Sequence, residues 1–165
     1  MTSADDANES PATALCKSCG LCCTGHLFVW TKLRSVELTA IQSLGINVLR
    51  EPGQRGFSQP CPLWQGQCTI YESPNYPRFC HTYKCKLLKQ VIDESTSLPE
   101  ALTVVRRAKE MIAELELLLP LSAKVSFRER MIEYFEREDV GLEFRLKADV
   151  LLFVYEKQFG VTDLV

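Results

Sequence analysis

Cys-Lys-Ser-Cys-Gly-Leu-Cys-Cys, residues 16–23, is the most unusual stretch of this 165-residue chain. Four thiols within eight residues are far more than core packing requires. The spacing Cys-x-x-Cys-x-x-Cys places sulfurs on successive turns of a tight loop, the geometry that tetrahedral zinc or an iron–sulfur cluster needs. Gly20 lies where such a loop takes a positive φ or brings the backbone close to sulfur. The stretch therefore predicts a metal-binding segment.

Four more cysteines follow at wider spacing, and the chain has none after residue 85. Residues 1–15 carry three acids and no base, without the basic and apolar regions of a signal peptide. We therefore expect a cytoplasmic, reducing environment, in which cysteines bind metals rather than form disulfides. The candidate metal ligands are Cys16, Cys19, Cys22, Cys23, Cys61, Cys68, Cys80 and Cys85.

Composition excludes some classes of partner. The chain is 46% hydrophobic and 24% charged, as in ordinary globular proteins, and no apolar run is long enough to span a bilayer. Residues 16–90 carry nine Lys or Arg against three Asp or Glu. This basic excess offsets the charge of metal-bound thiolates. Because no nucleic-acid-binding motif accompanies it, we expect neither nucleic acid nor a membrane as a partner.

The expected organisation is one domain with three segments. Residues 1–14 are small, polar and acidic, and we expect a disordered tail. Residues 15–92 form the cysteine-cluster metal-binding region, and residues 93–165 form a helical region packed on it. The predicted fold class is mainly α. Its cysteine-rich half has short helices and a small hairpin around metal, and it packs on a C-terminal helical hairpin or bundle.

Turn and helix patterns in the sequence predict the secondary structure around the later cysteines. Residues 50–60 are predicted to be a loop, because Gly, Pro and polar residues fill them. A Gln-Gly-Gln turn between Cys61 and Cys68 predicts a small hairpin with one cysteine on each arm. A helical pattern begins just before Cys80, which we expect in the entering turn, with Cys85 in the first turns of the helix.

The C-terminal half shows clear helix signals. Ser97-Leu-Pro-Glu100 is a capping box with an early proline, and apolar residues then recur at helical spacing until Pro120. A second capping box spans residues 126–129. A third helix is expected from about Leu142 to Phe159, with Gly160 as its C-cap. On its inward face we expect Leu146, Val150, Phe153 and Val154.

The cysteine pattern resembles a known family. Besides the opening motif, the chain has Cys61-Pro62, Cys-Thr-Ile-Tyr-Glu at 68–72, Pro77, and the pair Cys80 and Cys85. Together they resemble the CxxCxxCC cysteine-cluster family, described as a zinc- or iron-chelating domain. The resemblance covers residues 16–88, about half of the chain. It implies metal binding without implying a reaction.

Two departures from the family's pattern leave the ligand positions unchanged. Members usually have Arg-Pro where this chain has Tyr76-Pro77 in a stretched turn. They usually have Cys-Arg-x-Phe where this chain has Cys-His-Thr-Tyr at residues 80–83. Any function of the missing arginines is therefore not carried over.

The arrangement of the cysteines limits which metals could bind but does not decide between zinc and iron–sulfur. Adjacent Cys22 and Cys23 diverge, so we expect them to serve different sites, or one of them to be a redox or neighbouring thiol that does not bind metal. Eight thiols divide into two four-thiolate zinc sites, or into one iron–sulfur cluster with the remaining thiols for another metal. The 16–22 spacing followed by a remote Cys61-Pro62 resembles three-plus-one ligation of a 4Fe–4S cluster, which favours iron–sulfur over zinc. His26 follows Cys23 by three residues, and His81 follows Cys80 directly. Either could be a ligand, but with eight thiols available we expect a hydrogen-bond donor behind the ligands or a solvated side chain.

The predicted function is metal binding with a structural, electron-transfer or sensing role. One alternative is a zinc-stapled module that binds an unidentified protein partner. Another is a component of a protein-modifying enzyme, because some larger relatives of the family look like protein lysine methylases. The chain has no glycine-rich nucleotide loop and no Ser/His/Asp arrangement, which argues against an enzyme. A cysteine nucleophile is possible, so the sequence leaves enzymatic activity open.

Overall fold

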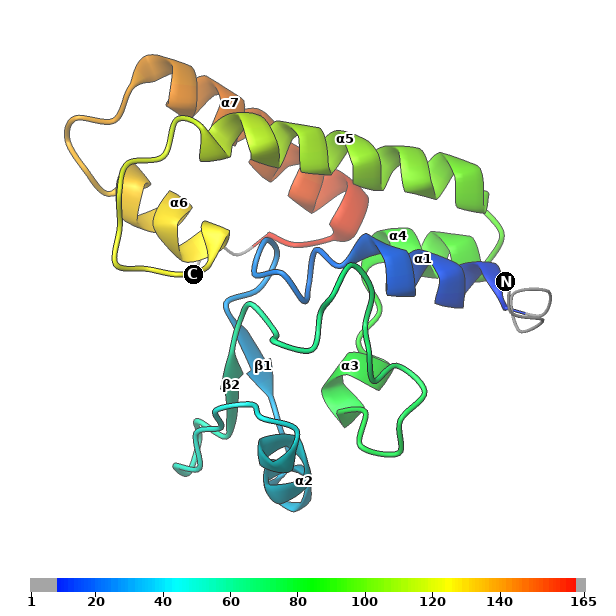
Figure 1. Cartoon of the computed structure of the whole chain (residues 1–165). Helices are drawn as coiled ribbons and strands as arrows, with labels where there is room; N and C mark the ends of the chain where they lie inside the picture. Colours follow the sequence, from blue (N-terminus) through cyan, green and yellow to red (C-terminus); the bar gives the residue numbers. More distant parts are fainter. Residues whose placement is uncertain (1–8, 163–165) are drawn as a thin grey trace.

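The computed structural model describes residues 9–162 and is mainly helical, as predicted. Helices α5, α6 and α7 form an upper layer, with α1 and α4 beneath it and a lower lobe of α2, α3, β1 and β2 (Figure 1). None of the helices in the described part is long and apolar enough to cross a lipid bilayer. In chain order the elements are α1 (Pro11–Cys19), β1 (Trp30–Lys32), the 3-10 helix η2 (Ser35–Glu37), α2 (Leu38–Ser43), β2 (Gly56–Ser58), α3 (Arg78–Thr82), α4 (Lys86–Ile92), α5 (Leu98–Glu116), α6 (Phe127–Phe135), α7 (Leu142–Val154) and the π-helix η3 (Tyr155–Phe159).

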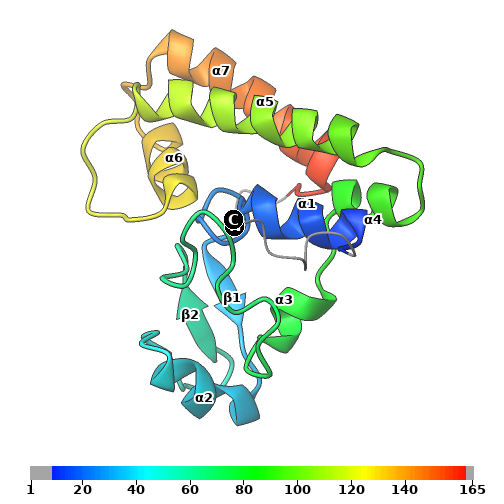
Figure 2. The ribbon, with the colours of Figure 1, turned by 45° about the vertical axis from the view of Figure 1, so that its right-hand side comes forward.

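The main core lies between the upper layer and the pair α1 and α4. Helices α5 and α7 run side by side, and α1 and α4 pack against α5 from below (Figures 1 and 2). The predicted packing of the C-terminal helices on the cysteine region is therefore confirmed. The largest buried side chains of this core are Tyr155, Phe127, Phe144, Phe159, Leu21, Leu27, Leu87, Leu115, Met131 and Leu151.

The lower lobe has its own small core around a two-stranded antiparallel sheet, in which Thr31 is opposite Phe57. The prediction of a loop over residues 50–60 was wrong at β2. A Cβ added at Gly56 would lie 2.1 Å from the carbonyl oxygen of Thr31, so only glycine allows the strands to approach. The lobe's buried apolar residues are Leu33, Leu38, Ile41, Ile46 and Phe57.

Helix α1 was not predicted, because residues 1–14 were expected to be disordered and residues 16–23 to form a loop. The Ser10 hydroxyl accepts a hydrogen bond from the Thr13 amide at 3.1 Å, and Pro11 occupies the first helical position. The expectation of a disordered tail to residue 14 was therefore wrong for residues 11–14. Residues 1–8 of that tail lie outside the described residues.

Both predicted capping boxes mark real helix starts. The Glu100 carboxylate accepts from the Ser97 amide at 2.9 Å, and the Ser97 hydroxyl accepts from the Glu100 amide at 3.4 Å. The Ser126 hydroxyl accepts from the Glu129 amide at 3.2 Å. Each cap stabilises its helix by about 1 kcal/mol. Helix α5 ends at Glu116, one turn before Pro120.

Helix α7 packs with the opposite face from the one predicted. Leu146, Val150 and Phe153 are exposed, and Val154 is only half-buried. The helix is apolar on both faces, so helical periodicity fits either one. The face that packs carries Phe144 and continues into Tyr155 and Phe159 of η3. The buried residues of α7 and η3 are Phe144, Ala148, Leu151, Tyr155 and Phe159. The predicted C-cap is confirmed, with Gly160 at φ 70°.

The two faces of α7 can be compared with matched leucine truncations. Leu151→Ala leaves a cavity in the main core and should lower the free energy of unfolding by about 2–5 kcal/mol. Leu146→Ala removes an exposed side chain and should lower it by less than about 0.5 kcal/mol. Urea unfolding in dilute solution measures both. Equal losses would contradict this orientation of α7.

Candidate metal centre

All eight cysteines are free thiols and partly buried. Cys16 and Cys19 lie on α1, one turn apart on the same helix face, so the expected loop is a helix at this point. Gly20 then ends the helix in the left-handed conformation at φ 69°, which confirms the predicted positive φ. Cys22 and Cys23 follow in the turn. The spacing Cys-x-x-Cys suits a helix as well as a loop, and the Ser10 cap favours the helix.

Trp64 covers this turn. A Cβ at Gly20 would lie 2.1 Å from Cζ2 of the Trp64 indole, so glycine is required by contact as well as by φ. The turn is closed by the Thr24 amide, which donates to the Gly20 carbonyl at 2.9 Å. Leu21 points into the main core and is buried. The backbone around the central cysteines is thus fixed from both sides.

The other four cysteines come from three segments. Cys61 and Cys68 flank a turn closed by a single antiparallel bridge between Trp64 and Cys68, in place of the predicted hairpin strands. The helix expected beyond residue 77 is two helices with a break at residues 83–85. Cys80 therefore lies inside α3. Cys85 is the N-cap of α4, and its Sγ accepts from the Leu88 amide at 3.4 Å.

One group of thiols joins the turn to the lower lobe. The Cys23 carbonyl accepts from the Cys61 amide at 2.7 Å. Burial raises the pKa of Cys23, and nearby Cys80, Cys61 and Cys68 raise it further. Burial likewise raises the pKa of Cys80 to about 12, with Cys61 and Cys68 adding to it. We call Cys23, Cys61, Cys68 and Cys80 the lower thiol set.

The remaining four, Cys16, Cys19, Cys22 and Cys85, are the upper thiol set. All pack against the main core, and with Cys23 they line a narrow cavity of about 60 Å³. Burial raises the pKa of Cys22 well above its usual range, and Cys19 and Cys85 add to the shift. Burial also raises the pKa of Cys16 and of Cys19 to about 11, with Cys85 adding in each case.

The grouping differs in one member from the predicted three-plus-one pattern. Cys85 lies with Cys16, Cys19 and Cys22, whereas Cys61 lies near Cys23. The adjacent Cys22 and Cys23 are thus influenced most by different thiols. Pairing of Cys85 with α1 depends on the contact between α1 and α4, which residue spacing does not encode.

The thiols lie near one another, but their sulfurs do not point at a common metal position. Over residues 9–162, no three His, Cys, Asp or Glu side chains are placed to hold one metal ion. The donor chemistry nevertheless fits a thiophilic metal, because four cysteines complete the ligand set of structural zinc or of a 4Fe–4S cluster. Crowded, buried thiols stay protonated at neutral pH, and a bound cation would supply the positive charge that lets them ionise. Binding would have to draw each set's sulfurs inward.

The histidines have other partners. Nδ1 of His26 lies 2.5 Å from the Thr24 hydroxyl, and its ring is 5.3 Å from Phe127. Burial lowers the pKa of His26 and so favours its neutral form. His81 is exposed, with its ring 6.3 Å from that of Tyr76. These contacts leave the eight thiols as the candidate ligands.

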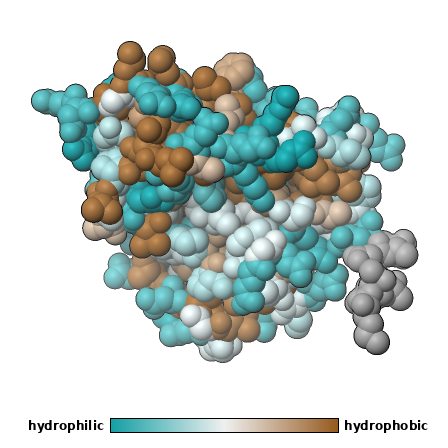
Figure 3. Space-filling model, turned by 45° about the horizontal axis from the view of Figure 1, so that its top comes forward, coloured by the Kyte–Doolittle hydropathy of each residue, from teal (hydrophilic) through white to brown (hydrophobic). Residues whose placement is uncertain are grey.

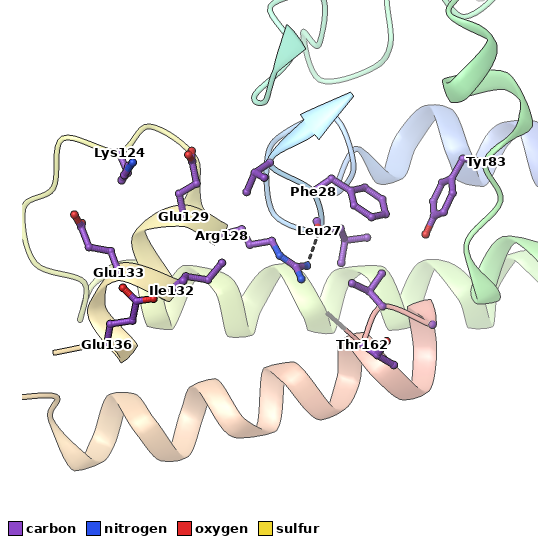
Figure 4. A pocket seen from close by; sticks show the side chains of 13 residues that line it. Leu27, Phe28, Tyr83, Lys124, Arg128, Glu129, Ile132, Glu133, Glu136 and Thr162 are labelled. Atoms are coloured by element: carbon purple, nitrogen blue, oxygen red, sulfur yellow. Dashed lines mark hydrogen bonds between the residues drawn. The ribbon is translucent and has the colours of Figure 1, made fainter. Parts of the chain in front are cut away.

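A larger cavity of about 660 Å³ lies between α6, the segment before β1 and residues 160–162 (Figure 4). Tyr83 lines both this cavity and the narrow one, and its ring meets Phe28 edge-on at 5.0 Å. Arg128 is only 6% exposed, and its Nη1 donates to the Leu27 carbonyl. The sequence analysis missed this cavity, because α6, the segment before β1 and residues 160–162 meet there only in the folded chain.

Comparisons of the chain with protein-family models, with curated proteins and with solved structures found no match. The resemblance to the CxxCxxCC family therefore rests on the motifs quoted above.

The contact between Gly20 and Trp64 can be tested against a matched glycine. Gly66→Ala places a side chain at φ 80° in open space and should cost about 1–2 kcal/mol of unfolding free energy. Gly20→Ala has a similar backbone strain at φ 69° and must also displace Trp64. It should therefore lower the unfolding free energy clearly more than Gly66→Ala. Urea unfolding followed by tryptophan fluorescence measures the difference. Similar costs for the two variants would contradict the close contact.

Proposed function

We propose that this protein binds two metal centres through cysteine thiolates, one at the upper thiol set and one at the lower thiol set. The observation that carries the proposal is that Cys16, Cys19, Cys22 and Cys85 pack against the main core. Cys23 is instead tied to Cys61, whose amide donates to the Cys23 carbonyl. Four thiolates suffice for tetrahedral zinc and for a 4Fe–4S cluster. The resemblance to the CxxCxxCC family supports metal binding of this kind.

A structural role suits the lower centre. Its four cysteines come from the turn after α1, the 61–68 segment and α3, which have few apolar residues of their own. The small core of the lower lobe does not include α3. A metal here would join α3 to the turn after α1 and to the 61–68 segment. Structural zinc contributes on the order of 10 kcal/mol of folding free energy.

The upper centre is placed for a further role. Its thiols lie against the main core, and Tyr83 lines both the narrow cavity and the larger one. An iron–sulfur cluster at this position would supply electron transfer or sensing, and zinc would supply structure. A reducing, cytoplasmic location keeps all eight thiols available for either metal.

The larger cavity favours a second candidate function. Its volume of about 660 Å³ falls in the range of small-molecule sites, which is roughly 300–1,000 Å³. A ligand there would meet Tyr83, which also lines the narrow cavity of the upper thiol set, and this suits a component of a modifying enzyme. A zinc-stapled interaction module, by contrast, needs no such cavity.

The division of ligands can be tested by paired substitutions. Wild-type protein purified without oxygen should carry two centres, measured as iron, zinc and sulfide per chain. Cys22→Ser and Cys85→Ser should each remove the upper centre, and combining them should remove nothing more. Combining Cys22→Ser with Cys61→Ser should remove both centres. Ser18→Ala, a change between two ligands on α1, is the matched control and should keep both.

Two results would contradict the proposal. Full metal content in any of the cysteine variants would exclude that residue as a ligand. Loss of both centres from the Cys22/Cys85 pair, with folding retained, would overturn the division into two sets. Brown protein with stoichiometric sulfide identifies iron–sulfur centres, and colourless protein with two zinc ions identifies zinc sites.

A further inference from the structure

Four large apolar side chains lie in a row on the exposed face of α7. Leu142, Leu146, Val150 and Phe153 are 71%, 58%, 50% and 59% exposed, and we call them the α7 stripe. Figure 3 shows apolar side chains gathered on the side of the molecule where α5 and α7 lie. At 100° per residue, these four positions fall within a narrow sector of the helix surface.

The opposite face of α7 is already buried. Phe144, Ala148 and Leu151 pack into the main core and are 2% exposed or less. A helix that is apolar on two opposite faces is normally covered on both. Contiguous exposed apolar surface of this kind marks an interaction site. The α7 stripe is therefore a surface that lacks its partner in the single chain.

Charged residues beside the stripe indicate which partner fits. Arg145 and Asp149 are both exposed and lie along the same flank of the stripe. Neither forms an ion pair within the described residues, although Arg145 lies over the Phe135 ring at 5.9 Å. The opposite flank is occupied, because Lys147 pairs with Glu114 of α5 at 2.5 Å.

We propose that the α7 stripe is the surface through which two copies of this chain form an antiparallel dimer. Two antiparallel helices related by a twofold axis bring the same flank of each copy together, with reversed direction. Arg145 of one copy then meets Asp149 of the other, and this happens twice. The midpoint of the Arg145/Asp149 pair falls at Lys147, within one residue of the midpoint of the stripe, so apolar contacts and ion pairs form in one register.

The apolar contacts follow from the same register. Leu142 of each copy lies opposite Phe153 of the other, while Leu146 and Val150 fill the centre. A parallel pair would instead turn the Arg145/Asp149 flank towards Lys147, whose ammonium group is already paired. A second copy in the antiparallel orientation is thus the partner whose charges match this surface.

The dimer can be tested on the metal-loaded full chain by analytical ultracentrifugation over a range of concentrations. Wild-type protein should sediment as a monomer–dimer equilibrium. Leu146→Glu and Phe153→Glu should each raise the dissociation constant at least about tenfold, by placing a charge in the interface. Val36→Glu, at another apolar residue that is 79% exposed, should leave it unchanged. Circular dichroism checks that each variant is folded.

A charge exchange tests the antiparallel orientation. Arg145→Glu and Asp149→Arg should each weaken the dimer through like-charge contacts, and the double variant should restore it. A monomer at every concentration overturns the proposal, as does a dimer that stripe substitutions do not affect. A dimer that the stripe variants disrupt but the double exchange does not rescue overturns the antiparallel register.

Discussion

Thiolates repel one another, and a protein interior of low polarity strengthens that repulsion. The eight cysteines bring this problem to one region. Burial raises the pKa of every one of the eight thiols, and neighbouring thiols raise it further for all except Cys68 and Cys85. Lys17, Lys89 and Lys109 lower the pKa of Cys68, Cys85 and Cys19, but burial outweighs them. The thiols are therefore protonated at neutral pH, and any metal that binds must displace their protons. Metal loading and local structure are linked through this constraint.

The helical layer positions the upper thiol set. Helices α1 and α4 pack against α5, and they supply Cys16, Cys19 and the N-cap Cys85 from regular secondary structure. The lower thiol set has less such support. Cys23 lies in a turn, Cys61 and Cys68 flank another turn, and only Cys80 lies on a helix, the short α3. The two sets thus differ in how far the polypeptide alone positions them.

Features fixed by neighbouring residues were predicted well. The Ser97 and Ser126 caps and the Gly160 C-cap follow from interactions within one helical turn. The errors arose where the local structure depends on contacts between residues far apart in the sequence. Periodicity does not choose between the two apolar faces of α7, and only packing against α5 and α6 does so. Strand β2 has three residues and exists because Gly56 can approach β1. The place of Cys85 beside Cys16 and Cys19 likewise depends on how α4 docks.

A single peptide bond joins Cys22 to Cys23, and it separates the upper thiol set from the lower one. Whatever immobilises either side chain also restricts the φ and ψ angles next to the other. Part of the conformational entropy that ordering the second set would cost is therefore lost when the first set becomes ordered. Binding at one set is therefore expected to favour binding at the other without being required for it.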